Sequence, residues 1–240
     1  MSAGVRAFRG RAVRRGFSLI ELMVVVIIIG IIAALAVPGM IQTQYDREAY
    51  TDAGSIMMLF REARTRSVAR GAAELISMTA TSGGSTTDRG TFSLYEAVTA
   101  NATGGGLNRT PVGSCKAPTS WVTLTTGTSN TGAGTAGIFI DGVNLNGAAS
   151  TLEAIAGIQV SMSYYPMATP TPPTPFVSGF ICFTPLGRSY VAVPATGTPV
   201  FDGMLPSTTP LEFDVTWSGS ATTRAVLLPP NGMTRLFSHT

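Results

Sequence analysis

Glu21 is the one acidic residue in the segment RRGFSLIELMVVVIIIGIIAALAVPGM, which covers positions 14–40 of the 240-residue chain. Every residue from Leu22 to Val37 is apolar or glycine. An ionised carboxylate at membrane depth is unfavourable unless it has a partner, and a nearby ammonium group offsets part of that cost. The chemistry open to Glu21 is therefore ion pairing, and some part of the molecule or of a neighbour must supply the positive charge.

The apolar run around Glu21 is long enough to cross a bilayer. Together with Phe17, Leu19 and Ile20 it approaches the roughly 20 residues that a spanning helix needs. Its many Val and Ile residues would favour a strand in water, but a segment in lipid must satisfy its own backbone hydrogen bonds and so forms a helix. Five arginines precede the run: Arg6, Arg9, Arg11, Arg14 and Arg15. The positive-inside rule places that end in the cytoplasm and the chain after Pro38 outside it.

Three kinds of N-terminus fit a basic leader followed by an apolar run. A cleaved secretory signal is one, because Ala34-Leu35-Ala36 is a small-x-small site, although the run is long for a signal core. A plain signal anchor is the second, but it leaves Glu21 without a role. The third is a processed N-terminus in which cleavage creates a new charge.

The residues Arg14-Arg15-Gly16-Phe17-Ser18-Leu19-Ile20-Glu21-Leu22 resemble the cleavage and methylation motif of type IV pilins and type II secretion pseudopilins. The shared features are the glycine before the cut, the phenylalanine after it, the glutamate at the fifth mature position, and Pro38 after the apolar run. The resemblance implies that a prepilin peptidase cuts between Gly16 and Phe17 and that the Phe17 amine is then methylated. The new ammonium on Phe17 would lie one helical turn from Glu21, which supplies the missing partner for assembly.

A long amphipathic helix is predicted to continue from the apolar run. Pro38 removes one helix hydrogen bond and is expected to kink or locally melt the helix. Apolar residues then recur at helical spacing up to Ala63, and Gly71 after Arg70 predicts the end of the helix. We therefore divide the chain into a basic leader (1–16), a transmembrane or fibre-core half (17–37), an amphipathic half (38–70) and a β-rich domain (71–240).

The β-rich domain is predicted from short β-prone runs that are bounded by turn residues. The runs are Leu75–Thr79, Thr91–Val98, Trp121–Thr125, Gly137–Ile140, Ile155–Tyr165, Phe176–Phe183, Ser189–Val193, Leu211–Trp217, Arg224–Leu228 and Thr234–Phe237. The Gly-, Thr- and Ser-rich stretches 81–90, 100–110 and 127–137 are expected to be exposed loops. The fold class is α+β and pilin-like: a long N-terminal helix packed on an antiparallel β-sheet or sandwich.

The β-rich half also resembles the H-type pseudopilin and FimT-like minor pilin group. The segments that carry this likeness are GIFIDGVNLNG (137–147), FICFTPLGR (180–188) and RAVLLPPNGMTR (224–235), which occur in the order typical of that group. The likeness implies an Asp/Asn/Gly hairpin followed by two strands that each lead into a Gly-Arg segment.

Two cysteines, Cys115 and Cys182, make a disulfide plausible if the domain lies in an oxidising compartment. Closing a loop of this size would stabilise the fold by about 4 kcal/mol on the chain-entropy model. The alternative is two buried thiols, since the sequence does not fix the distance between them.

Metal and nucleic-acid sites are only weakly indicated. Asp141, Asn144, Asn146 and Glu153 follow part of an EF-type calcium loop, but Asp141 is one residue out of register, and Asn-Gly turns are common in hairpins. Arg188, Arg224 and Arg235 are candidate contacts to DNA phosphates, by resemblance to FimT-like proteins of natural transformation. Without the five leader arginines, 11 of the 16 basic residues remain against 13 acidic ones, so the net charge is −2 and nucleic acid is an unlikely partner.

The function expected from these observations is structural. The only histidine, His239, lies near the end of the chain, and no nucleophile elbow or phosphate loop is present, so neither an enzyme nor a cofactor is expected. We expect a minor pilin or pseudopilin of the bacterial inner membrane that passes once through the bilayer and then enters a pilus or pseudopilus. Its implied partners are the prepilin peptidase and methyltransferase, sibling pilins, the inner-membrane assembly platform and lipid. A DNA-binding pilin and a plain secreted or anchored β-domain are the alternatives.

Overall fold

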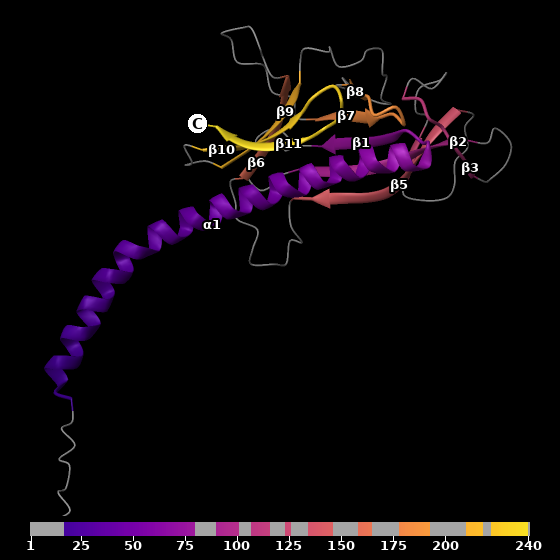
Figure 1. The fold of residues 1–240 in the computed structure, drawn as a ribbon. Helices are drawn as coiled ribbons and strands as arrows, with labels where there is room; N and C mark the ends of the chain where they lie inside the picture. The colour runs from indigo at the N-terminus through magenta and orange to yellow at the C-terminus, as the bar shows by residue number, and fades with distance from the viewer. Residues whose placement is uncertain are drawn as a thin grey trace, which may run out of the picture. The chain divides into compact units, whose positions relative to one another are not determined.

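The computed structural model of the chain describes most of its helix and strands. The described residues are 17–79, 90–100, 107–115, 123–125, 134–145, 158–164, 178–192, 210–217 and 222–239. The chain divides into two compact units, Met1–Thr43 and Gln44–Thr240. The amphipathic part of the helix from Gln44 onward belongs to the same unit as the strands (Figure 1).

Helix α1 runs from Leu19 to Arg70 and is 52 residues long. It ends where the sequence predicts, because Gly71 adopts a φ of 68° and its amide donates to the Ser67 carbonyl at 3.1 Å. Of the two effects expected of Pro38, a kink or local melting, local melting does not occur, since the helix continues through that residue. A proline removes a single helix hydrogen bond, and the residues around it evidently maintain the remaining ones.

The strands form two sheets. The first has the order β4-β5-β2-β1-β7-β8 with β3 paired to β2, and the second has the order β11-β10-β9-β6. The pairs are antiparallel except β4 with β5, which is parallel. The bounds are β1 Glu74–Thr79, β2 Thr91–Ala100, β3 Leu107–Pro111, β4 Thr123–Thr125, β5 Gly134–Asn144, β6 Ile158–Tyr164, β7 Ser178–Phe183, β8 Ser189–Ala192, β9 Leu211–Trp217, β10 Thr223–Leu228 and β11 Arg235–His239.

The α+β pilin-like layout is confirmed, and the differences from the predicted strands are local. Strand β3 was missed because its sequence, LNRTP, lacks a β-prone pattern, and we predicted 100–110 to be an exposed loop. Strand β5 begins at Gly134, within another predicted loop. In both cases pairing with the long strand β2 overrides the weak local preference.

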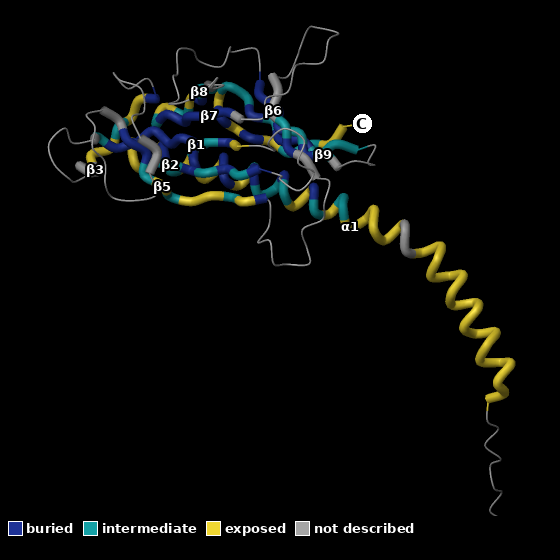
Figure 2. Tube along the Cα trace, turned by 180° about the vertical axis from the view of Figure 1, so that it is seen from behind, coloured by how far each residue is buried: buried dark blue, intermediate teal, exposed yellow. Residues whose placement is uncertain are grey.

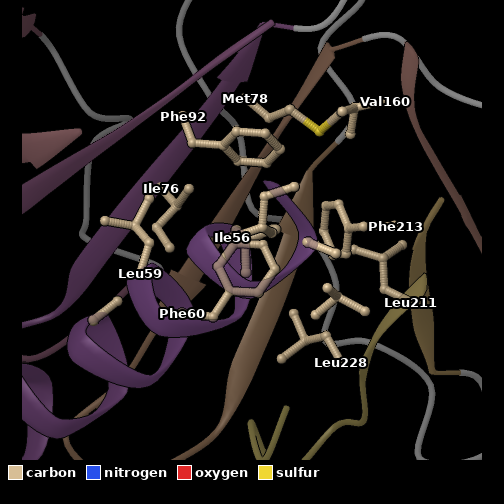
Figure 3. Packing of buried hydrophobic residues seen from close by; sticks show 14 of the residues in the cluster. Ile56, Leu59, Phe60, Ile76, Met78, Phe92, Val160, Leu211, Phe213 and Leu228 are labelled. Atoms are coloured by element: carbon tan, nitrogen blue, oxygen red, sulfur yellow. The ribbon is translucent and has the colours of Figure 1, made fainter. Parts of the chain in front are cut away.

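One apolar core joins α1 to both sheets (Figure 3). Phe60 of α1 is fully buried, and its ring centroid lies 4.8 Å from that of Phe213 in β9. The same ring lies 6.2 Å from Phe92 in β2 and 6.3 Å from Phe183 in β7. Aromatic pairs at these separations add to the free energy gained from burial. The helix therefore packs on the first and second sheets at the same time.

A second core lies on the other face of the first sheet. Successive residues of a strand point to opposite faces, so Ile181 and Phe183 belong to the helix-facing core whereas Phe180 and Cys182 belong to this one. Cys182 forms a disulfide with Cys115, 67 residues earlier, with a Cα–Cα distance of 5.9 Å. The bond ties the segment after β3 to strand β7.

Two glycine turns meet beneath α1 and connect the sheets. Gly187 lies between β7 and β8 and Gly232 between β10 and β11, with φ values of 75° and 73°. The Ser189 amide donates to the Pro230 carbonyl at 3.3 Å, which links the turns directly. Arg64 of α1 covers both, and its Nε donates to the Asn231 carbonyl at 3.2 Å. The positive φ favours glycine at both positions, and at Gly232 an added Cβ would also lie only 3.1 Å from Arg64 Cδ.

Replacing Gly232 with alanine is expected to lower the free energy of unfolding more than the same change at Gly71. Both glycines have positive φ, which costs an alanine about 1 to 2 kcal/mol. A Cβ at Gly232 would also lie 3.1 Å from Arg64 Cδ, whereas a Cβ at Gly71 meets nothing within 4 Å. Urea unfolding of the full chain in mild detergent, followed by tryptophan fluorescence, would measure both losses. Equal losses would show that Arg64 packing does not contribute.

Candidate functional site

The N-terminal unit presents an apolar helix surface with no cover from the described residues. All the described side chains from Phe17 to Ala36 are exposed, including Ile27 at 60% and Leu35 at 78% (Figure 2). By length and composition, α1 contains one segment able to cross a membrane, near the N-terminus. The predicted cleavage residue Gly16 and the side chain of Pro38 lie outside the part of the chain that the structure describes.

Glu21 lies in the first turn of α1, where its backbone is capped by Ser18. The Glu21 amide donates to Ser18 Oγ at 3.3 Å and to the Ser18 carbonyl at 3.1 Å. Ser18 is thus the residue that caps the helix, and Glu21 occupies the third helical position, as in a capping box. The sequence signal for this cap is the spacing Ser-x-x-Glu, which our sequence analysis missed. A first-turn glutamate also interacts favourably with the helix dipole.

Two of the three arginines considered as DNA contacts line one pocket in the second unit. The pocket has a volume of about 590 Å³ and is lined by Tyr50, Met57, Arg61, Arg224, Arg235, Leu236, Phe237 and Ser238. Arg61 was not predicted, and its Nη2 donates to the Thr234 carbonyl at 3.4 Å. Arg188 lies before β8 and does not line this pocket. Among the described residues, the lining is cationic and aromatic without an acidic side chain.

Of the four weak calcium candidates, the two that the structure describes lie in a strand rather than a loop. Asp141 and Asn144 lie within strand β5, three residues apart, so their side chains point to opposite faces of the sheet. Asp141 Oδ1 accepts a hydrogen bond from the Gly142 amide at 2.7 Å. Asn146 and Glu153 lie outside the described residues. The pairing of β5 with β2 continues to Asn144, so Asp141 and Gly142 lie in a strand, and the Asn146-Gly147 part of the predicted hairpin lies outside the described residues.

Two acidic residues are buried beside the C-terminal end of α1. Glu74 and Glu96 face each other across β1 and β2 and are 0% and 4% exposed. Arg66 Nε lies 3.6 Å from Glu74 Oε1, and Arg70 Nε lies 2.8 Å from Glu96 Oε2. Arg66 Nη1 also lies 3.9 Å from Glu62 Oε1, an i,i+4 pair, and its Nη2 donates to Glu96 Oε2 at 3.4 Å. The cluster fastens the helix end to the sheet.

A second acidic group lies on the second sheet. Glu212 and Asp214 of β9 lie near His239 of β11, and each of the three residues offers one possible metal ligand. Burial raises the pKa of Glu212 to about 7, and the Asp214 carboxylate acts in the same direction. Burial also raises the pKa of Asp214. Sequence analysis missed this group because His239 was set aside as a terminal residue and three strands had to be paired to bring it together.

The described residues combine one helix that is long and apolar enough to cross a membrane with an α+β domain. The family model of the prokaryotic N-terminal methylation motif matches residues 11–37. The match supports the type IV pilin and pseudopilin superfamily, and with it a pilin-like protein that is processed by prepilin peptidase and assembles with other pilins. The search of curated proteins and the search of solved structures each found no significant match.

Replacing Glu74 with glutamine is expected to stabilise the domain increasingly as the pH rises. Burial raises the pKa of Glu74 from 4.5 to about 8, although the charge of Arg66 acts in the opposite direction. Between these values the folded chain holds a proton that the unfolded chain has lost, so stability falls with rising pH by up to about 1.4 kcal/mol per pH unit. Glutamine stays neutral and avoids this loss.

The measurement is the difference in unfolding free energy between the Glu74→Gln variant and the wild type. It should grow from about pH 5 to about pH 8 and then level off. Glu62→Gln is the matched control, because Glu62 contacts the same arginine from an exposed position, and its difference should stay flat. A pH-independent difference for Glu74→Gln would show that its carboxyl group keeps an ordinary pKa in the folded chain.

Proposed function

We propose that the chain is a minor pilin or pseudopilin subunit that helps to initiate, or occupies the tip of, a type IV pilus or a type II secretion pseudopilus. The observation that carries the proposal is the methylation motif at 11–37 at the start of a 52-residue helix whose first part is apolar and exposed. Such a surface requires lipid before assembly and neighbouring helices after it. The order of the segments 137–147, 180–188 and 224–235 is what favours the H-type and FimT-like group.

The remaining parts of this proposal follow from charge and from chemistry. The five leader arginines place the N-terminus in the cytoplasm and the β-rich domain in the periplasm. The inner-membrane assembly platform and sibling pilins are its partners. Its role is mechanical rather than enzymatic, and it needs no cofactor.

DNA capture is a second candidate function. The observation that favours it is the convergence of Arg61, Arg224 and Arg235 on one pocket with Tyr50 and Phe237. Guanidinium groups bind phosphate, and aromatic rings can stack on bases. Three arginines on a slightly acidic domain make a small phosphate footprint, so structural assembly remains the first proposal.

Glu21 is expected to pair with the Phe17 ammonium, and two substitutions separate this role from helix capping. Glu21→Gln keeps a residue suited to the capping box but removes the charge, whereas Glu21→Ala removes both. Both variants should insert and be cleaved normally, and both should enter fibres at least about 10-fold less than the wild type, a loss that corresponds to 1.4 kcal/mol. Quantitative immunoblotting of sheared or overexpressed fibres measures incorporation.

Mass spectrometry of the mature N-terminus provides the control for this experiment. A start at methylated Phe17 in all three proteins shows that processing is intact. Wild-type incorporation of Glu21→Gln would exclude the charge pair and leave capping as the role of Glu21. A mature start at Val37, or an uncut chain, would exclude the pilin proposal itself in favour of a secreted or anchored β-domain.

The DNA candidate predicts that Arg224→Gln and Arg235→Gln together weaken duplex binding at least about 10-fold and reduce its salt dependence. Gel-shift assays at low salt, with the mature chain in non-ionic detergent, would measure this. Arg188→Gln is the matched control, because Arg188 has the same charge but does not line the pocket. Absence of binding at low salt, or equal effects of all three substitutions, would remove DNA capture as a function of this pocket.

A further inference from the structure

We propose that Glu212, Asp214 and His239 bind one divalent first-row transition-metal ion, such as Zn²⁺, on the face of the second sheet that points away from the core. Each residue offers one ligand atom, and these atoms all lie within 4.8 Å of one another. The residues come from strands β9 and β11, which are separated by β10. The ion would therefore tie the edge strand β11 to the interior of its sheet.

Strand alternation places both carboxylates on this face. Phe213 and Val215 are fully buried in the core, so Glu212 and Asp214 point the other way. On the intervening strand, Ala225 is the residue paired with Asp214. On β11, Phe237 is paired with Ala225 and His239 with Thr223, so His239 lies on the same face of the sheet as both carboxylates.

The imidazole of His239 reaches both carboxylates across β10. Its ring lies 5.8 Å from the ring of Phe237, two residues earlier on the same face, at an interplanar angle of 30°. This contact restricts the orientation of the imidazole. His239 Nε2 lies 3.2 Å from Glu212 Oε1 and 3.5 Å from Asp214 Oδ1. Ligand atoms about 2.1 Å from a tetrahedral ion lie roughly 3.4 Å apart, so these two separations already suit a shared metal.

The second observation is the state of the Glu212 carboxylate. Glu212 is 6% exposed, and its Oε1 is buried without accepting a hydrogen bond from the described part of the chain. A buried carboxylate oxygen in this state is unfavourable, and it is directed at the other two ligands. The side chains of Asp214 and His239 are 23% and 44% exposed, so an ion can enter from solvent.

The three ligand atoms, one nitrogen and two carboxylate oxygens, determine which kind of ion the site prefers. Calcium and magnesium take oxygen ligands, whereas a histidine nitrogen with two carboxylates suits zinc and its neighbours. Two carboxylates balance the charge of a divalent ion. Three protein ligands leave a fourth position for water, which matches the solvent-facing side of the group.

Isothermal titration of ZnCl₂ into the mature full-length chain tests the proposal, in mild detergent and without a histidine tag. We expect one zinc per chain, a higher melting temperature with zinc, and a shift of the imidazole proton resonances of His239, the only histidine. His239→Ala and Asp214→Asn should each bind zinc at least about 10-fold more weakly. Asp141→Asn, which removes an exposed carboxylate from β5, is the matched control and should bind as the wild type does.

Three results would overturn the proposal. The first is an absence of zinc binding by the wild type, and the second is undiminished binding by both His239→Ala and Asp214→Asn. The third is equally strong binding of calcium at the same residues, which would contradict the assignment to transition metals. Far-ultraviolet circular dichroism of each variant establishes that a loss of binding does not reflect a loss of fold.

Discussion

Phe60 is the residue on which the two-sheet domain depends, because its ring contacts phenylalanines from both sheets. It lies 4.8 Å from Phe213 of the second sheet and 6.2 Å from Phe92 of the first, centroid to centroid. Phe92 and Phe213 are themselves only 6.2 Å apart, so the three rings form one contact group. Each sheet has an apolar face that must be covered, and one helix covers both faces through this group (Figure 3). Small residues on the same side of α1, such as Ala53 and Ala63, let the strands approach closely.

The same helix meets two different environments along its length. From residue 44 onward it belongs to the domain, and Arg64, Arg66 and Arg70 add polar contacts to the aromatic ones. From Phe17 to Ala36 its side chains are exposed and, apart from Ser18 and Glu21, apolar, which is stable only in lipid or among other helices.

The sequence predicted those features that depend on local pattern. Helical spacing predicted the buried positions from Ala49 to Ala63, and Gly71 predicted the end of α1. Alternation in Leu211–Trp217 gave the inward-facing Phe213 and Val215. The features that the sequence does not predict depend on pairing between distant segments. Strand β3 forms because it pairs with β2, and the two glycine turns meet only after both sheets have formed. The distance between Cys115 and Cys182 is likewise not predictable from local pattern, since 67 residues separate the two cysteines.

The acidic residues show most clearly why local sequence pattern does not predict where a site forms. Glu74, Glu96 and Glu212 are buried, although an isolated charge in a short strand is ordinarily read as solvent-exposed. Burial of a carboxylate is tolerated where the fold brings a positive charge to it. Glu96 receives this charge from Arg66 and Arg70, whereas Glu74, which lies 3.6 Å from Arg66 Nε, keeps its proton up to about pH 8 because burial outweighs the charge of Arg66. Glu212 and Asp214 receive only one imidazole from the described residues, and the resulting deficit of positive charge on that face is what an added cation would correct.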